Sequence, residues 1–262
     1  MLLTATDWDD HAFHFGSFDD AFVRDAPRLV RAGERCIDLG AQKGFFAMIL
    51  ARAVGPAGVV LAIEADPAAL ELLEQHRRRL AIPSLRILPV AVGEREGEEI
   101  TFHLNKQIGW SSRFPNAGQS TSVTQAITFK TRTVDGLVSE QMGDRAAPIS
   151  LVKIDVEGSE VRVIAGMRAT LERETPIIWM EVNTPSLEAA GATVDELDAK
   201  LAPLGYRFYL PDYDLSLMGS PRVWYTPFER LRDVPRAEFD IVAVPERYAD
   251  RWKIVYNSGS KR

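Results

Sequence analysis

The stretch Cys36-Ile-Asp-Leu-Gly-Ala-Gln-Lys-Gly-Phe-Phe46 decides which fold the sequence predicts. A short apolar run ends at Leu39, glycines follow at positions 40 and 44, and an apolar helical pattern begins after them. Gly40 allows the chain to turn tightly off a strand, and Gly44 allows the start of the helix to lie close to a ligand. The free amides at the start of a helix suit polar or anionic ligand groups. The stretch therefore predicts a ligand-binding turn between a strand and a helix.

The same alternation of strand and helix patterns continues along the chain. Strand-like runs lie at 35–39, 58–64, 85–92, 151–156, 177–182, 206–210 and 239–244, and helical patterns at 44–54, 67–80, 159–172 and 194–201. This spacing is typical of an α/β fold, and near-continuous apolar strands predict a mostly parallel sheet with helices on both faces. Two segments interrupt the alternation. Residues 93–135 have a hairpin pattern (99–104 and 127–133) around a polar loop, and residues 211–236 are rich in proline and aromatic side chains.

Composition and charge exclude several classes of protein. The 262 residues are 46% hydrophobic and 26% charged, which is typical of a folded globular chain and not of a disordered one. A net charge of −6 disfavours nucleic acid and anionic membranes as partners. No apolar run is long enough to span a membrane, and the N-terminus lacks a secretory pattern. The single cysteine, Cys36, excludes an intrachain disulfide, fits a cytoplasmic location and is expected to be a small core residue.

Carboxylates at the ends of the first two predicted strands indicate the kind of cofactor. Glu64 can accept hydrogen bonds from ribose hydroxyls, and no arginine follows it closely to bind the 2′-phosphate of NADP. The second glycine of the turn comes four residues after Gly40, unlike the dinucleotide pattern G-x-G-x-x-G. Asp38 would repel a pyrophosphate but suits the amino group of a methionine moiety. The pattern favours S-adenosylmethionine over NAD or FAD; the alternative is that both acids only cap turns.

A second group of charged side chains follows the fourth predicted strand. The two-residue period of a strand places Lys153, Asp155 and Glu157 on one side, facing the same crevice as Asp38. The two acids could position a hydroxyl, accept its proton or hold a cation. Alternatively, Lys153 forms a structural ion pair with one acid, and Glu157 caps the next helix. Glu181, at the end of the fifth strand, is a further candidate acid.

Histidine is the other candidate base, because its ordinary pKa lies near neutrality. His76 belongs to a charged helix and is expected to be solvated, whereas His103 belongs to a hairpin strand and is expected to be structural. His11 and His14 precede the first strand, and an N-terminal segment folded over the pocket would bring one of them in. His14 therefore joins Asp155 and Glu157 as a candidate catalytic residue. No spacing is specific for metal ligands, so no metal is predicted.

Further motifs occur in a fixed order along the chain. They are Ile37-Asp-Leu-Gly-Ala-Gln-Lys-Gly-Phe-Phe46, Ala62-Ile-Glu-Ala-Asp-Pro67, Val90-Ala-Val-Gly93, Thr133-Val-Asp-Gly-Leu137, Val152-Lys-Ile-Asp-Val-Glu-Gly-Ser-Glu160, Ile164-Ala-Gly-Met167 and Ile178-Trp-Met-Glu-Val182. Together they resemble the FkbM-type family of S-adenosylmethionine-dependent methyltransferases over about residues 33–183. One departure is Gln42, where the family usually has asparagine.

The resemblance implies a Rossmann-like class I methyltransferase fold with a seven-stranded sheet whose last strand is antiparallel. It implies a single domain over 1–262, with an N-terminal cap (1–32), a cofactor-binding core (33–183) and loops 105–125 and 211–236 around the acceptor. The implied cofactor is S-adenosyl-L-methionine, bound by Asp38, Gly40, Ala41, Gln42, Gly44, Phe45, Glu64, Ala65, Ala91 and Asp155.

The implied reaction is O-methylation of a hydroxyl on a small molecule, either a natural product or a sugar. Three alternatives stay open at this point: an NAD-type oxidoreductase on the same topology, a methyltransferase that acts on macromolecules, and a binding module without catalysis.

Overall fold

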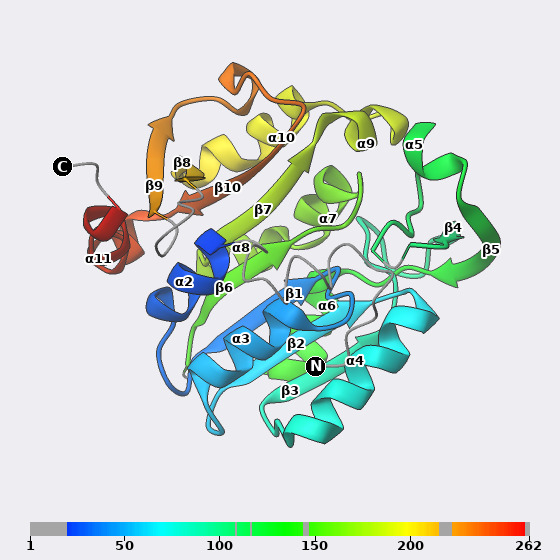
Figure 1. Cartoon of the computed structure of the whole chain (residues 1–262), viewed down its shortest axis with the longest axis horizontal. Helices are drawn as coiled ribbons and strands as arrows, with labels where there is room; N and C mark the ends of the chain where they lie inside the picture. The colour runs from blue at the N-terminus through cyan, green and yellow to red at the C-terminus, as the bar shows by residue number, and fades with distance from the viewer. Residues whose placement is uncertain (1–19, 108, 116, 144–146, 215–221, 260–262) are drawn as a thin grey trace.

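The structure is a computed structural model, in which residues 20–107, 109–115, 117–143, 147–214 and 222–259 are described (Figure 1). The described residues form an eight-stranded sheet in the order β3-β2-β1-β6-β7-β10-β8-β9 and a separate two-stranded sheet, β4-β5. Five neighbouring strands run parallel: β3 (Leu85–Pro89), β2 (Val59–Glu64), β1 (Arg35–Leu39), β6 (Ile149–Ile154) and β7 (Ile177–Asn183). The predicted α/β class and mostly parallel sheet are confirmed.

The other edge of the large sheet is antiparallel. Strand β10 (Glu238–Val244) lies between β7 and β8 (Arg207–Asp214) and runs antiparallel to both, and β9 (Arg222–Phe228) pairs with β8. The predicted count of seven strands is therefore wrong by one. Part of 211–236, predicted as a loop, forms the edge strand β9, because Val223 and Tyr225 alternate inward into the core. Pro227 is tolerated in β9 because an edge strand leaves some of its backbone N–H positions without a neighbouring strand.

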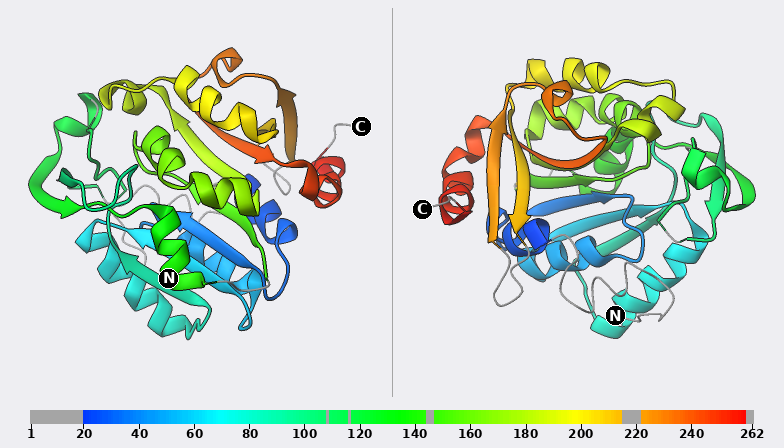
Figure 2. Two further views of the ribbon diagram at one scale, coloured as in Figure 1. Left: turned by 180° about the vertical axis from the view of Figure 1, so that it is seen from behind. Right: turned by 45° about the horizontal axis from the view of Figure 1, so that its top comes forward.

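Helices cover both faces of the sheet, as Figure 2 shows from two further sides. One face carries α2 (Asp20–Leu29), α3 (Phe45–Val54), α4 (Pro67–Leu80) and α11 (Ala249–Gly259); the other carries α6 (Val134–Met142), α7 (Glu160–Gly166), α8 (Arg168–Glu174), α9 (Thr184–Ala189) and α10 (Val194–Leu201). The two faces alternate along β1, where Ile37 and Leu39 join one core cluster and Cys36 joins the other. Cys36 is fully buried, as predicted, and burial raises the pKa of its thiol to about 12.

Two predicted segments differ from the structure. The helix predicted over 159–172 is two helices, α7 and α8, which meet at Met167. The described part of the predicted N-terminal cap contains α2, which packs on α3 and α11 and covers the sheet. No helix in the described ranges is both long enough and apolar enough to cross a membrane.

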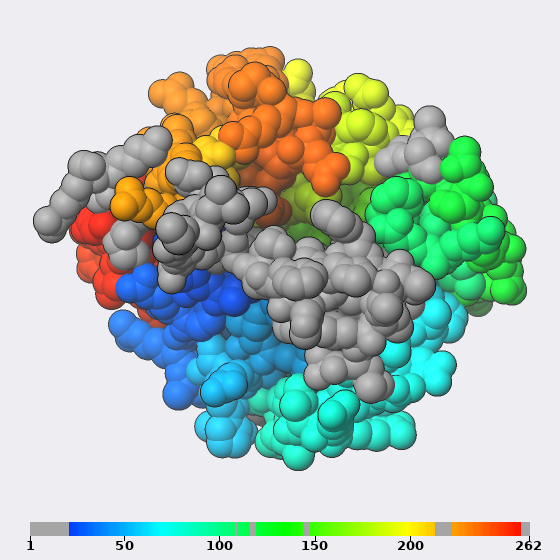
Figure 3. Space-filling model, in the orientation of Figure 1, coloured from blue at the N-terminus to red at the C-terminus, as the bar shows by residue number. Residues whose placement is uncertain are grey.

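The small sheet is a hairpin of β4 (Glu99–Asn105) and β5 (Val123–Lys130). The short helix α5 (Ala117–Ser120) belongs to the segment of chain that connects the two strands. Figure 3 shows this hairpin, in green, on the surface at one end of the molecule. Hydrogen bonds join it to the loops that follow β2 and β6. The hairpin therefore stands over the carboxyl ends of the parallel strands.

Candidate active site

A cavity of about 320 Å³ opens at the carboxyl ends of the parallel strands. Residues within 40–46, 63–69, 90–92 and 155–159 form one side of it, from the loops after β1, β2, β3 and β6. Residues 109–111, Arg113, Ile100 and Phe102 of the hairpin segment form the other side, together with Glu181 and Glu238. Open α/β sheets bind ligands at this edge, and the volume is at the lower end of the ~300–1,000 Å³ of small-molecule sites.

The glycine turn after β1 fits tightly between its neighbours. Gly40 has φ +76°, and a Cβ there would lie 1.7 Å from the carbonyl oxygen of Asp155. The amides of Gly40 and Ala41 both donate to the carbonyl of Ile63, at 3.0 Å. Glycine is needed at position 44 for a different reason from the predicted closeness to a ligand. A Cβ there would lie 2.1 Å from Leu73 on α4, and Gly44 does not line the cavity, so it permits helix packing.

Glu64 is held rigidly at the end of β2. Its carboxylate accepts hydrogen bonds from the amides of Gln42 (2.8 Å), Ala65 (2.7 Å) and Asp66 (2.7 Å). Burial raises the pKa of Glu64, and these three amides oppose the rise. A carboxylate has about four acceptor positions, so Glu64 can still accept a ribose hydroxyl.

An apolar slot lies beside Glu64. Ala65, Ala91 and Ile100 form a small buried cluster against which Phe102 packs, and all four residues line the cavity. A flat heteroaromatic ring fits such a surface, next to the carboxylate that suits its ribose. Ile100 and Phe102 were missed as site residues, although their two-residue spacing in the predicted hairpin strand places them on one face.

Asp38 lies below the glycine turn and not on the cavity wall. It is fully buried, and neither carboxylate oxygen has a hydrogen-bond partner among the described residues. Burial raises the pKa of Asp38 to about 7, against the attraction of the Lys153 ammonium. Lys153 Nζ bonds Asp155 Oδ2 at 2.8 Å and lies 4.2 Å from the centre of the Phe46 ring. The ion pair considered as an alternative for Lys153 is therefore present.

The acidic end of the cavity brings together four carboxylates: Asp155, Glu157, Glu181 and Glu238. Burial and the nearby Asp155 raise the pKa of Glu157 to about 8. The charge of Asp155, with burial, also raises the pKa of Glu181. Arg113 is the one cationic side chain among the described lining residues, and it is paired with Glu98 at 2.6 Å. The wall is electrostatically suited to a cationic ligand.

The hairpin is fastened to both halves of the site. Ser111 Oγ donates to Asp66 Oδ2 at 2.5 Å, and Ser112 Oγ donates to the carbonyl of Glu157 at 2.8 Å. Gln119 Nε2 donates to Glu157 Oε2 at 2.7 Å. No sequence signal pointed to Ser111 or Gln119, because these contacts join segments far apart in the chain.

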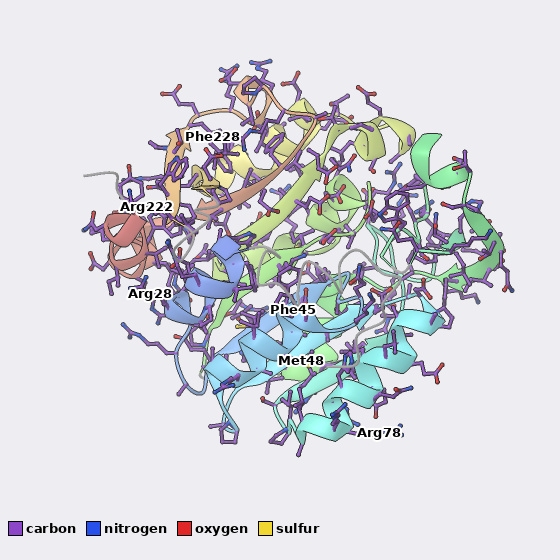
Figure 4. All side chains as sticks on the ribbon, viewed as in Figure 1. Arg28, Phe45, Met48, Arg78, Arg222 and Phe228 are labelled. Atoms are coloured by element: carbon purple, nitrogen blue, oxygen red, sulfur yellow. The ribbon has the colours of Figure 1, made fainter. Side chains whose placement is uncertain are left out.

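The two predicted acceptor loops differ in their placement. Residues 109–111 and Arg113, within the predicted loop 105–125, line the cavity, as does the half-exposed Trp110. None of the described residues of 211–236 does so. Figure 4 shows why: Arg222 and Phe228 lie at the two ends of β9, away from Phe45 at the start of α3. The described residues of 211–236 therefore lie away from this cavity, and their predicted role at the acceptor stays a prediction.

The histidines also differ in their placement. His76 is fully buried, with Nδ1 2.8 Å from the carbonyl oxygen of Lys43, so the expected solvation is wrong. The reason is that this side of α4 packs on the glycine turn. His103 lies in β4, as predicted. His11 and His14 lie outside the described residues, and the role of His14 stays a prediction. Across the described ranges, no group of three His, Cys, Asp or Glu side chains is arranged to hold a metal ion.

Comparisons with known proteins agree with this geometry. A family model described as the methyltransferase FkbM domain matches residues 38–208. A methyltransferase FkbM from Methylobacillus flagellatus KT has a similar structure, with a TM-score of 0.50, 17% identity, and coverage of 86% of this chain and 47% of that one. The chain thus spans about half the length of that structure.

Two further solved structures have lower scores. Fibrillarin from Aeropyrum pernix, with natively bound S-adenosyl-L-methionine, has a TM-score of 0.44 at 14% identity, covering 86% of this chain and 76% of that one. A SAM-dependent O-methyltransferase from Thermotoga maritima has a TM-score of 0.42 at 16% identity, and the match covers 87% of this chain and 64% of that one. A search of curated proteins gave no significant match.

The family match covers well over half of the chain and contains the parts from which the site is built. It begins at Asp38, includes the Gly40 turn, Glu64 and the acids after β6, and ends in β8. The rigid carboxylate beside an apolar slot, and the acidic wall beyond it, fit the ribose, the adenine and the cationic end of the expected cofactor. The chain therefore belongs to the FkbM methyltransferase family, for which S-adenosyl-L-methionine is the expected methyl donor.

Proposed function

We propose that the chain transfers a methyl group to a hydroxyl of a small molecule, such as a natural product or a sugar, and that Glu157 is the base. The observation that carries this proposal is the state of the Glu157 carboxylate. It lies on the cavity wall, and its pKa, raised to about 8, is suited to exchanging a proton near neutral pH. Oε1 of this carboxylate has no hydrogen-bond partner among the described residues and is therefore open to an acceptor hydroxyl.

The chain's own residues offer a place for each part of the cofactor. Glu64 would hold the ribose, and Ala65, Ala91, Ile100 and Phe102 would enclose the adenine. The turn 40–42 would border the methionine part, above the buried Asp38. The bound cofactor supplies an electrophilic methyl group on a positively charged sulfur. That methyl would lie at the acidic end of the cavity.

Glu157 is better placed than Asp155 to accept a proton. The Lys153 ammonium donates a hydrogen bond to Asp155 at 2.8 Å, so this carboxylate is already held in an ion pair. Glu157 has no cation bonded to it among the described residues. Glu157 would therefore accept the proton of the acceptor hydroxyl when that oxygen receives the methyl group that the bound cofactor supplies. Much of the rate enhancement would come from holding the acceptor oxygen ~3 Å from the methyl group and in line with the bond that breaks.

The acidic wall also weighs against the other functions considered. A pyrophosphate at this end of the cavity would find no free cation among the described lining residues to neutralise it, which disfavours an NAD-type oxidoreductase. A nucleic acid would meet the same carboxylates, and Arg113 is already paired with Glu98.

Two measurements test the proposal. Calorimetric titration should show binding of S-adenosylhomocysteine and none of NAD. Radiolabelled methyl transfer to a panel of polyhydroxylated small molecules, amines and RNA should label a hydroxyl. Glu157→Gln should then lower kcat by about 100-fold or more, which is the usual contribution of a general base. The exposed Glu188→Gln on α9 is the matched control. Labelling of nitrogen or RNA alone, or full activity of Glu157→Gln, would contradict the proposal.

A further inference from the structure

Gln119 is a buried amide outside the parallel-sheet core that reaches the proposed base. It lies on α5 in the hairpin segment and is 5% exposed. Its Nε2 donates to Glu157 Oε2 at 2.7 Å, and this is the one hydrogen bond that the described residues give to that carboxylate. A buried amide aimed at a carboxylate fixes both the direction of the acid and its preferred charge.

The hairpin holds Gln119 in place through its backbone. Asn105 Nδ2 donates to the carbonyl of Gln119 at 3.0 Å, and the amide of Ser122 donates to the same carbonyl at 3.1 Å. Asn105 is itself 8% exposed. The adjacent bond from Ser112 Oγ to the carbonyl of Glu157 fastens the hairpin to the same residue a second time. The position of Gln119 is thus set by the hairpin and not by solvent.

The backbone of Glu157 is fixed from the opposite side. Its φ of +49° is unusual for a residue other than glycine. Glu160 Oε1 accepts from the amides of Val156 (3.4 Å) and Gly158 (3.2 Å), and so braces the turn. With the backbone held by α7, the contact that fixes the carboxylate of Glu157 is the one from Gln119.

The charged groups with the largest effects on Glu157 are acids, so Gln119 has an electrostatic effect too. Asp155 after β6, Glu160 on α7 and Glu238 on β10 raise the pKa of Glu157, and the charge of Glu157 in turn raises the pKa of Glu181 on β7. Gln119 opposes them by bonding the charged form. Without this amide, the carboxylate would hold its proton more tightly and accept one less readily.

We infer that Gln119 is a positioning residue for the transfer reaction: it orients the Glu157 carboxylate toward the acceptor and stabilises its ionised form. This inference rests on the proposed role of Glu157 as base. It makes the hairpin part of the catalytic apparatus as well as a wall of the acceptor site.

The test is a ¹³C NMR titration of glutamate carboxyls in the whole chain with S-adenosylhomocysteine bound, which needs no acceptor. The Glu157 signal is assigned by its loss in Glu157→Gln. Gln119→Leu removes the amide at similar volume and should raise the proton affinity of Glu157 about tenfold, since a hydrogen bond to a charged group is worth at least that factor. Gln125→Leu, an exposed glutamine on β5 of the same hairpin, should leave the titration midpoint unchanged.

Two further readouts keep the outcomes separate. The affinity for S-adenosylhomocysteine should stay within twofold in Gln119→Leu, because Gln119 does not line the cavity. Ser112→Ala removes the second fastening without touching the carboxylate and should also leave the midpoint in place. An unchanged Glu157 midpoint in Gln119→Leu would overturn the inference, even if O-methylation is found. A raised midpoint together with full activity of Glu157→Gln would instead overturn the role of Glu157 as base.

Discussion

Replacing Gly40 with alanine tests the tightest contact at the base of the site. A Cβ at Gly40 would lie 1.7 Å from the Asp155 carbonyl oxygen, and contacts under 3.0 Å force a shift. The turn or the end of β6 would have to move by more than 1 Å. Such a shift would strain three hydrogen bonds, from Gly40 and Ala41 to Ile63 and from Asp155 to Leu39.

The expected cost has two parts. Alanine at φ +76° costs about 1–2 kcal/mol, because L-residues avoid this conformation. The three strained hydrogen bonds add about 2–3 kcal/mol, at roughly 0.7–1 kcal/mol each. Gly40→Ala should therefore lower the free energy of unfolding by about 3–5 kcal/mol. Because the turn also borders the cofactor site, the affinity for S-adenosylhomocysteine should fall at least tenfold.

Gly97→Ala is the matched control for this experiment. Gly97 has φ +72°, and a Cβ there would have nothing within 4 Å, so this variant shows the cost of the conformation alone. Urea unfolding followed by circular dichroism should give a loss of about 1–2 kcal/mol for Gly97→Ala and full affinity for the cofactor product. Equal losses of stability in the two variants would refute the reasoning about the Asp155 contact.

Three other predictions follow from the same geometry. Glu64→Gln should raise the dissociation constant of S-adenosylhomocysteine, measured by calorimetry, about 10- to 100-fold. The reason is that a charged carboxylate, which accepts hydrogen bonds from backbone amides and would accept one from the ribose, becomes a neutral amide. The exposed Glu71→Gln should leave the dissociation constant unchanged. Burial raises the pKa of Asp38 to about 7, so the folded apoprotein keeps a proton that the unfolded chain loses, and stability falls as pH rises from about 4 through 7. Asp38→Asn should make that fall shallower in urea titrations at pH 5 and pH 8, and an unchanged slope would contradict the burial argument. His76→Ala should cost about 2–4 kcal/mol in the same unfolding assay, because it removes a buried side chain and its hydrogen bond, against less than about 0.5 kcal/mol for the exposed Arg79→Ala.

Local sequence patterns predicted the parallel half of the fold well, because each signal there lies within a few residues. The apolar run 35–39, followed by glycines, predicted β1 and the turn after it. Asp66 before Pro67 predicted where α4 begins. The same patterns placed Glu64, Asp155 and Glu157 around one cavity, since the carboxyl ends of parallel strands meet at one edge of a sheet.

Other features depend on contacts between distant segments, which a local pattern does not contain. The edge strand β9 is stabilised by pairing with β8 and by burial of Tyr225, whose hydroxyl donates to Asp25 on α2 at 2.7 Å. His76 has charged neighbours in the chain and is buried only because α4 packs on the glycine turn. Gln119 reaches Glu157 across 38 positions, and no spacing in the sequence indicates that they meet.

The most direct test of the account is a crystal structure of the chain with S-adenosylhomocysteine bound. We expect a ribose hydroxyl within hydrogen-bonding distance of Glu64, the adenine between Ala91 and Phe102, and the sulfur facing the end of the cavity that contains Asp155 and Glu157. A ligand bound elsewhere, or one whose ribose leaves Glu64 without a contact, would contradict it.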